Sequence, residues 1–164
     1  MRTLHTNRLI LRDFVHSDAP EIAAALNDME TCRGLTMVPC PYTMADAEAF
    51  LAKPDKDARA VCTLDDQLIG VVGNGAQFGY WFAKAQWGKG YASEATQAVV
   101  ADHFAHSDAD LLSGYVSDNH ASAAVLRKLG FEITGDKMLH IRSRNKEVPS
   151  KSVVLTKSRW ETMT

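Results

Sequence analysis

The sequence of 164 residues has no long apolar run, and nowhere approaches the roughly 20 consecutive apolar residues that a membrane-spanning helix requires. Residues 1–13 contain neither an uninterrupted apolar segment nor a small-residue cleavage site, so we expect no secretory signal. The formal net charge is only −2, which gives no global positive field to attract nucleic acid or an anionic membrane. We therefore expect neither of these as a partner, and any bound anion must be held locally.

The chain also lacks the cysteine spacing that is typical of disulfide frameworks or metal sites. Its three cysteines, Cys32, Cys40 and Cys62, are an odd number without CxxC spacing, which indicates reduced thiols in a cytoplasmic protein. No zinc-type cluster is present in the sequence, so we expect no metal. The apolar fraction of 46% and the charged fraction of 23% are typical of soluble globular proteins. Without repeats, low-complexity tracts or linkers, residues 1–164 are expected to form one domain, as a monomer or a homodimer.

Hydrophobic periodicity and turn residues predict the helices and strands in the first half of the chain. Residues 8–14 are expected to form a strand, and residues 17–29 and 43–53 to form helices. The first helix has Ser17 or Asp18 as its N-cap and Glu21 placed for a capping box. Three strands follow at 58–64, 67–73 and 77–82, and their short connections permit hairpins but no parallel crossovers.

The second half alternates between helices and strands. A helix is predicted at 91–106, a strand at 111–116, and a helix at 119–129 that Gly130 closes at C′ with Phe131 against Leu126. Two strands complete the chain, at 131–136 and 148–157, the last pairing at a sheet edge. The order β-α-α-β-β-β-α-β-α-β-β indicates an α+β fold with a mixed central sheet of about seven strands and about four helices.

Two glycines, Gly88 and Gly90, directly precede the helix at 91–106. Four N–H groups at a helix start have no intrahelical partner and together carry roughly half a positive charge. A glycine-rich lead-in lets phosphate oxygens approach such donors, so residues 88–92 fit a diphosphate cradle. The alternative is a tight turn that needs glycine for a positive φ. A Walker loop is excluded because Lys89 is followed by Gly90, and Ser93 stands where a dinucleotide fingerprint has Gly or Ala.

The segment WGKGYASEA at 87–95 resembles the acetyl-CoA-binding motif Q/R-x-x-G-x-G/A of the GNAT superfamily of N-acetyltransferases. Gly90 and Ala92 match its last two fixed positions, whereas Trp87 departs from the first. Three further stretches are similar to the same family, particularly to its ribosomal-protein N-terminal acetyltransferase branch. They are TNRLILR at 6–12, FGYWF at 78–82 and DNHASAAVLRKLGF at 118–131.

This resemblance implies a GNAT fold in which two parallel strands, ending in YWF and LLSGYV, part to admit the pantetheine arm of acetyl-CoA. The arm would pair with free backbone groups of Tyr80, Trp81 and Phe82, and a backbone N–H of Trp81 or Phe82 would stabilise the oxyanion. Ser122 would face the cofactor and is one candidate proton donor to the thiolate. The implied acetyl-CoA contacts are Tyr80, Trp81, Phe82, Gly88, Lys89, Gly90, Tyr91, Ala92, Asn119, Ser122 and Lys128.

The implied reaction is direct attack of an amine on acetyl-CoA in a ternary complex. Many GNAT enzymes have a tyrosine as general acid where this sequence has Leu126, so Tyr91 and Tyr115 remain fallback donors beside Ser122. No general base stands out, and Asp118 is expected as an N-cap. For the other candidate general bases we expect a structural role rather than a catalytic one. These are Asp65, Asp66, Glu94, His103, His106 and His120.

Three functions remain open. The first is an acetyl-CoA-dependent N-acetyltransferase acting on an α-amine or a small-molecule amine, with residues 31–42 and 137–148 lining the acceptor side. The second is an acyl-CoA sensor of the same fold that no longer catalyses transfer. The third is a nucleotide-dependent oxidoreductase, for which Asp108 would be the ribose-binding acid. The acceptor cannot be chosen from the sequence.

Overall fold

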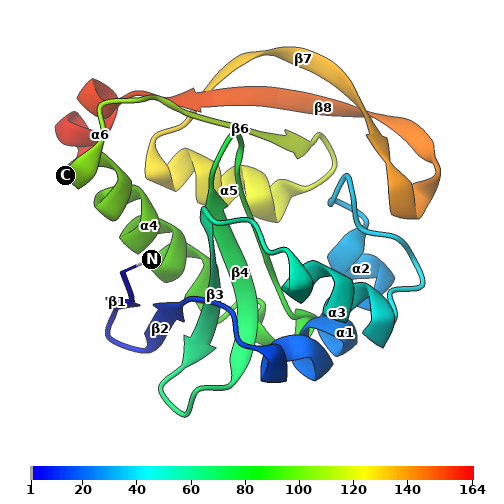
Figure 1. Ribbon diagram of the computed structural model, residues 1–164. Helices are drawn as coiled ribbons and strands as arrows, with labels where there is room; N and C mark the ends of the chain where they lie inside the picture. Colours follow the sequence, from blue (N-terminus) through cyan, green and yellow to red (C-terminus); the bar gives the residue numbers. More distant parts are fainter. Residues whose placement is uncertain (1) are drawn as a thin grey trace.

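The computed structural model describes residues 2–164 (Figure 1). Over these residues the chain forms eight strands and six α-helices, with three short 3₁₀ turns. In chain order these are β1 (Leu4–His5), β2 (Leu9–Arg12), η1 (His16–Asp18), α1 (Ala19–Leu26), α2 (Met29–Cys32), α3 (Met44–Ala52), β3 (Ala58–Thr63), β4 (Leu68–Asn74), β5 (Phe78–Phe82), η2 (Lys84–Gln86), α4 (Tyr91–His106), β6 (Leu111–Val116), α5 (His120–Leu129), β7 (Glu132–Ile141), η3 (Arg142–Arg144), β8 (Lys146–Leu155) and α6 (Lys157–Met163).

The strands form two antiparallel sheets, one in the order β1-β2-β3-β4-β5 and one in the order β6-β8-β7. The α+β class is confirmed, but the strands do not join into the single mixed sheet that was expected. β8 is also not an edge strand, because it pairs with β6 on one side and β7 on the other. The elements β1, α2 and α6 were not predicted.

The predicted helix over 91–106 and the three predicted hairpin strands are confirmed. Asp18 is the N-cap residue of α1, one of the two predicted positions, but its side chain makes no cap bond to the helix. Its carboxylate instead binds the guanidinium of Arg12 and the N–H of Val15, and the predicted capping box with Glu21 is wrong. At the end of α5, Gly130 has φ 95° and the N–H of Phe131 donates to Leu126 O at 3.0 Å, as predicted for a Schellman end.

The five-stranded sheet is covered by helices on both faces. Alternate residues of a strand point to opposite faces, so Val61 of β3 packs on the side of α4 while Ala60 and Cys62 pack on the side of α1 and α3. An extra residue of β4, Ile69, forms a β-bulge opposite Val61 and Cys62. This arrangement explains why β3 and β4 are buried almost throughout.

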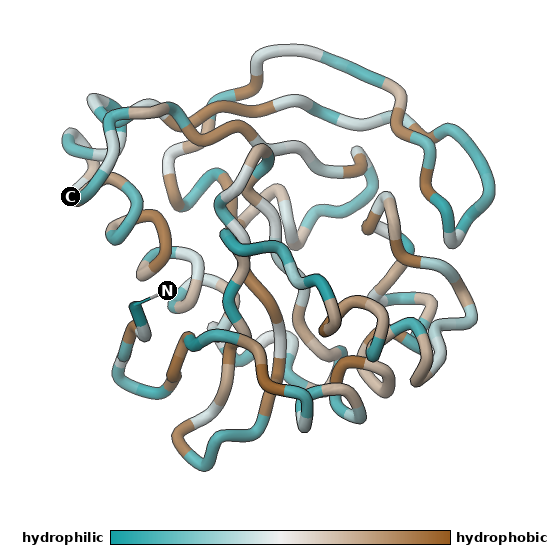
Figure 2. The backbone as a smooth tube through the Cα atoms, viewed as in Figure 1, coloured by the Kyte–Doolittle hydropathy of each residue, from teal (hydrophilic) through white to brown (hydrophobic). Residues whose placement is uncertain are grey.

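Figure 1 shows α4 on one flank, α1–α3 together on the other, and the β7–β8 hairpin across the top. In Figure 2 the hydrophobic segments concentrate on the central strands, and the tip of the β7–β8 hairpin is mostly hydrophilic. None of the helices described over residues 2–164 is long and apolar enough to cross a membrane.

Candidate active site between β5, α4 and α5

The two sheets meet where β5 and β6 lie next to each other. The hydroxyl of Ser113 on β6 donates a hydrogen bond of 2.7 Å to the carbonyl of Phe78, the first residue of β5. No ladder joins the two strands over the described residues, so the edge of β5 that faces away from β4 is open after Phe78. This arrangement agrees with the parted strands that the family resemblance implies.

The register of β4 and β5 determines which amides face the open edge. Ala83 N–H donates to Ile69 O at 2.9 Å, and Trp81 lies opposite Val71. Because inward and outward groups alternate along an antiparallel strand, the N–H of Trp81 points to β4 and that of Phe82 points to the open edge. Of the two expected oxyanion donors, the geometry therefore favours Phe82 and not Trp81.

Trp87 has a role that the sequence did not suggest. Its indole N–H donates a hydrogen bond of 2.8 Å to Phe82 O, while its ring is half exposed. This bond occupies the last outward carbonyl of β5. After Phe78, the outward backbone groups of β5 for which residues 2–164 show no partner are the N–H of Phe82 and both groups of Tyr80, which lies opposite Val72.

The chain between β5 and α4 adopts the conformation for which the glycines were singled out. Gly88 has φ 75° and Gly90, the N-cap of α4, has φ 82°, so both occupy the left-handed region. Gly90 has no side chain to cap α4, and the first helical bond runs from Glu94 N–H to Gly90 O. Within residues 2–164, no acceptor is recorded for the N–H groups of Tyr91 and Ala92. The tight turn and the anion cradle are thus compatible in one structure.

Asn119 and Ser122 enter the site from the first turn of α5. Asn119 is the N-cap, and its Oδ1 accepts from Ser122 N–H at 3.1 Å, which corrects the expectation that Asp118 caps this helix. With Oδ1 occupied, the Nδ2 amide of Asn119 is the group left to bind a ligand carbonyl. Asp118 instead forms an ion pair of 2.7 Å with Arg33.

Sequence analysis missed the side chain of Tyr80. Its hydroxyl lies 3.1 Å from Ser122 Oγ and 3.2 Å from Ser122 O, so it links β5 to α5 across the open edge. Burial raises the pKa of Tyr80 to about 12, although the contact with Ser122 opposes the shift. Tyr80 therefore keeps its proton at neutral pH and acts as a hydrogen-bonding group. An aromatic residue in a strand gives no signal of where its hydroxyl points.

The remaining candidate proton donors have structural positions. Leu126, which replaces the family's tyrosine, is 1% exposed and shares the main core with Phe131, as expected. The ring of Tyr91 lies under the guanidinium of Arg8, 4.6 Å from its centre. Tyr115 is partly buried against the same core.

Glu94 binds the N-terminal segment of the chain. Its carboxylate accepts hydrogen bonds from Thr6 Oγ1 at 2.6 Å, from Arg8 N–H at 3.0 Å and from Arg8 Nε at 2.7 Å. Burial acts to raise the pKa of Glu94, but these hydrogen bonds outweigh it and hold the pKa below its usual value. A carboxylate whose pKa is lowered and whose oxygens already accept hydrogen bonds is a poor general base, which agrees with the structural role expected for Glu94.

The other candidate bases are bonded elsewhere or lie at the surface. Asp66 has φ 62° in the β3–β4 turn and pairs with Arg12 at 2.7 Å. His103 Nε2 lies 2.7 Å from Ala109 O near the end of α4, and His120 is exposed in the first turn of α5. Asp108, the residue considered for ribose, forms an ion pair with Lys157 on the surface.

Two segments expected on the acceptor side contact each other beside α5. Arg142 N–H, in the β7–β8 hairpin, donates to Thr36 O at 3.1 Å, and Ser143 Oγ donates to Cys32 O at 3.1 Å. A β-carbon on Gly34 would stand 3.1 Å from Asn119 Nδ2, so the loop after α2 reaches the edge of the candidate site.

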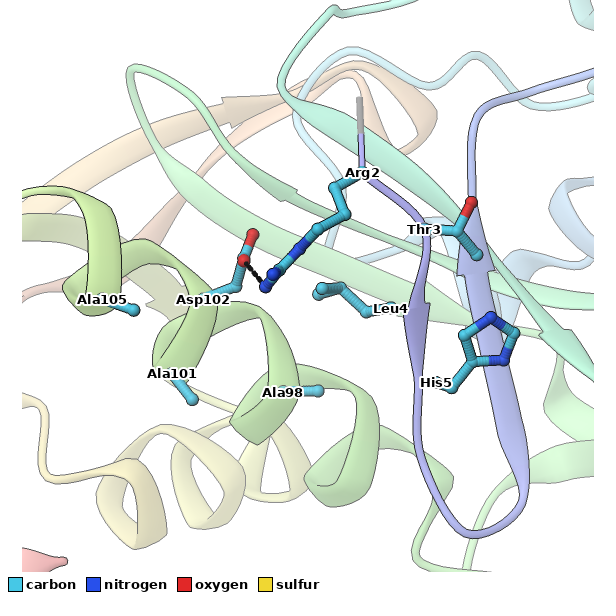
Figure 3. Close-up of a pocket in the computed structure, with 8 residues that line it drawn as sticks. All are labelled: Arg2, Thr3, Leu4, His5, Ala98, Ala101, Asp102 and Ala105. Atoms are coloured by element: carbon cyan, nitrogen blue, oxygen red, sulfur yellow. Dashed lines mark hydrogen bonds and ion pairs between the residues drawn. The ribbon is translucent and has the colours of Figure 1, made fainter.

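Two clefts lie along α4. The larger, of about 430 Å³, is formed by β1 and the later turns of α4 around the Arg2–Asp102 ion pair (Figure 3). Its lining residues on α4 begin at Ala98, about two turns after the helix start, so it is separate from the glycine turn. The smaller, of about 140 Å³, is lined by Ser93 and Lys128 together with residues of α6. Lys128 thus lies beside the first turn of α4.

Residues 8–132 match the acetyltransferase (GNAT) domain family. The chain belongs to this family. It is an acetyltransferase with the GNAT fold, which excludes the oxidoreductase and disfavours a sensor without catalysis. A curated relative, described as the uncharacterized N-acetyltransferase YoaA of Bacillus subtilis (strain 168), is 29% identical over 148 residues, which are 80% of this chain and 84% of the relative.

Solved structures of GNAT proteins superpose on nearly the whole chain. An acetyltransferase of this family from Bacillus anthracis has a TM-score of 0.85 at 20% identity, over 96% of this chain and 99% of that one. Spermidine N-acetyltransferase from Vibrio cholerae, solved with CoA and spermine, has a TM-score of 0.77 at 19% identity, over 95% and 99%. Ribosomal-protein-S5-alanine acetyltransferase from Vibrio fischeri has a TM-score of 0.73 at 17% identity, over 98% and 99%.

Proposed function

We propose that this chain transfers the acetyl group of acetyl-CoA to a primary amine by direct attack in a ternary complex. One observation carries the proposal: the open edge of β5 leads directly into an uncapped helix start with two left-handed glycines. Outward amides can bind an extended pantetheine arm, and the helix start can bind its diphosphate. The family makes acetyl-CoA the expected donor.

In this proposal, each part of acetyl-CoA binds a different part of the candidate site. The diphosphate binds the N–H groups of residues 88–92, and the pantetheine arm pairs with the outward groups of Tyr80 and Phe82. Asn119 Nδ2 donates to a carbonyl of the arm. Lys128, beside the cleft next to Ser93, lies at the nucleotide end.

Catalysis in this arrangement rests on positioning and on two hydrogen-bond donors. The acceptor nitrogen attacks the thioester carbon, and the N–H of Phe82 stabilises the negative charge on the carbonyl oxygen. As the carbon–sulfur bond breaks, the hydroxyl of Ser122 donates a hydrogen bond to the thiolate. Tyr80 holds that hydroxyl in place, the amine proton leaves through water, and the thiolate takes up a proton from water to become the thiol. The thiol of CoA and the acetylated amine are the products.

The acceptor that fits best is the α-amine of a protein or peptide N-terminus. Glu94, Asp118 and Asp66, three of the carboxylates considered as bases, are held in ion pairs. An α-amine of pKa about 8 is roughly one-tenth neutral at pH 7, whereas a lysine amine is neutral about four times in ten thousand. An α-amine therefore needs little help in losing its proton, which agrees with the resemblance to the ribosomal-protein branch.

A panel of acceptors tests this proposal. CoA release is measured with acetyl-CoA and peptides that begin with Ser, Ala or Met, each paired with a peptide of the same sequence whose N-terminus is blocked and whose internal lysine is free. Spermidine represents alkylamines. We expect turnover with free N-termini, at least tenfold less with blocked peptides and with spermidine, and a deficit in Ser122→Ala. Turnover restricted to spermidine would overturn the choice of acceptor, and no turnover with any amine would overturn the function.

A further inference from the structure

The opening segment at residues 6–12 resembles the family but has no role in the proposed mechanism. The structure joins it to the helix that begins at the glycine turn. Thr6 and Arg8 together make three hydrogen bonds to Glu94, in the first turn of α4, and Arg8 Nη2 adds an ion-pair contact of 2.6 Å. We call these three residues, Thr6, Arg8 and Glu94, the N-terminal clamp.

The clamp also reaches the turn itself. Arg8 Nη1 donates a hydrogen bond of 2.9 Å to Lys89 O, between the two left-handed glycines. A trans peptide unit is planar, with its C=O and N–H pointing in opposite directions. When Arg8 holds Lys89 O, the N–H of Gly90 must therefore point away from Arg8, to the other side of the turn.

The fork shape of the guanidinium makes this arrangement specific to arginine. Nε and Nη2 bind Glu94 while Nη1 binds Lys89 O, and the plane lies over the Tyr91 ring. A lysine ammonium is a single point of charge and cannot reproduce these directions together. The positive charge also offsets Glu94, whose free carboxylate would repel a diphosphate at the helix start.

We propose that Arg8 is a positioning residue for the diphosphate of acetyl-CoA, acting through the Lys89 carbonyl and the charge of Glu94. The inference rests on the proposed function, because it requires the diphosphate to bind residues 88–92. It predicts that loss of the clamp weakens only ligands that carry the diphosphate. It also predicts a higher KM for acetyl-CoA with little change in kcat, since Arg8 lies away from the reacting atoms.

The test compares two acetyl donors, acetyl-CoA and S-acetylpantetheine, which lacks all phosphate. For Arg8→Lys we expect kcat/KM to fall at least tenfold with acetyl-CoA and to stay within twofold with S-acetylpantetheine. Arg2→Lys is the matched control, because Arg2 is also an N-terminal arginine paired with a carboxylate of α4, Asp102. It should leave both values within twofold of the wild type.

Urea unfolding of each variant checks that it is folded. Should Arg8→Lys fail to fold, Glu94→Gln replaces it, with an expected loss of three- to tenfold for acetyl-CoA alone. Equal losses with both donors, or no loss with either, would overturn the clamp as a positioning device. A wild-type protein that takes up no acetyl-CoA would instead overturn the proposed function, so the two failures are distinguishable.

Discussion

A single methyl group added at Gly70 tests whether the distance between β4 and β5 sets the position of the reacting acyl group. A β-carbon there would stand 2.5 Å from Trp81 O and 2.6 Å from the ring of Phe82. The ring can rotate, but the carbonyl is part of the ladder, so β5 must shift by about 0.9 Å to reach an ordinary contact of 3.4 Å. That shift would move the N–H of Phe82, the proposed oxyanion donor.

Two consequences of Gly70→Ala can be estimated. Overpacking of this kind costs about 1–3 kcal/mol of folding free energy. A displacement near 1 Å in a reacting geometry can cost about 100-fold in rate. We therefore expect kcat to fall roughly 30- to 100-fold, while acetyl-CoA affinity changes less because residues 88–92 keep their conformation.

The assay combines urea unfolding, calorimetry with acetyl-CoA, and steady-state kinetics with the best acceptor of the panel. Gly73→Ala is the control on the same strand, because a β-carbon at Gly73 would lie 3.4 Å from the nearest atom, the Cβ of Ala58. Should Gly70→Ala lose stability but keep kcat within twofold of this control, the spacing of β4 and β5 would have no part in catalysis and the assignment of Phe82 would be refuted.

Three other predictions follow from individual side chains. Tyr80→Phe removes the hydrogen bond to Ser122, which is worth about 0.5–1.5 kcal/mol. We therefore expect kcat to fall roughly two- to tenfold while the affinity for acetyl-CoA stays unchanged. An unaltered kcat would contradict the role of Tyr80 in orienting Ser122. The lowered pKa of Glu94 contributes stability that is present above its usual pKa of 4.5 and is lost as the pH falls from there through the lower pKa of the folded protein. The unfolding free energies of wild type and Glu94→Gln should therefore converge in acid. A difference in unfolding free energy that stays constant with pH in urea titrations would contradict the stabilising role of the Glu94 carboxylate. Burial raises the pKa of Cys62 to about 12, so a thiol reagent should modify the partly exposed Cys40 first in the native protein, and rapid reaction of all three thiols would contradict the burial.

The parts of the fold that depend on local patterns could be predicted from the sequence. The helix at 91–106, the hairpins and the glycine end of α5 each follow from periodicity or turn residues within a short window. The number of sheets could not be predicted in this way. It depends on whether β5 and β6, which are separated by the 28 residues 83–110, pair or part. A side-chain bond from Ser113 to Phe78 O joins the two strands where they part.

The candidate site also has parts that could be predicted from local sequence and parts that could not. The glycine turn and Asn119 are recognisable because their residue types match what a helix start requires. Whether Trp81 or Phe82 directs its N–H to the open edge depends on which residues of β5 bond to β4. The backbone bond from Ala83 N–H to Ile69 O fixes this alternation. The partner of Tyr80 lies on α5, distant in sequence, so no local window contains that information.

The distribution of bonded groups argues for a site that works by positioning. Every carboxylate near the glycine turn or the start of α5 that was considered as a base is already paired with an arginine, whereas the outward N–H of Phe82 and those of Tyr91 and Ala92 have no partner recorded within residues 2–164. Unpaired backbone donors carry a free-energy cost that a bound ligand relieves. A chain that fixes its side-chain charges and leaves its amides open is suited to hold a thioester for an amine that is already neutral. For this reason the identity of the acceptor should affect the rate more than any single ionisable side chain of the protein.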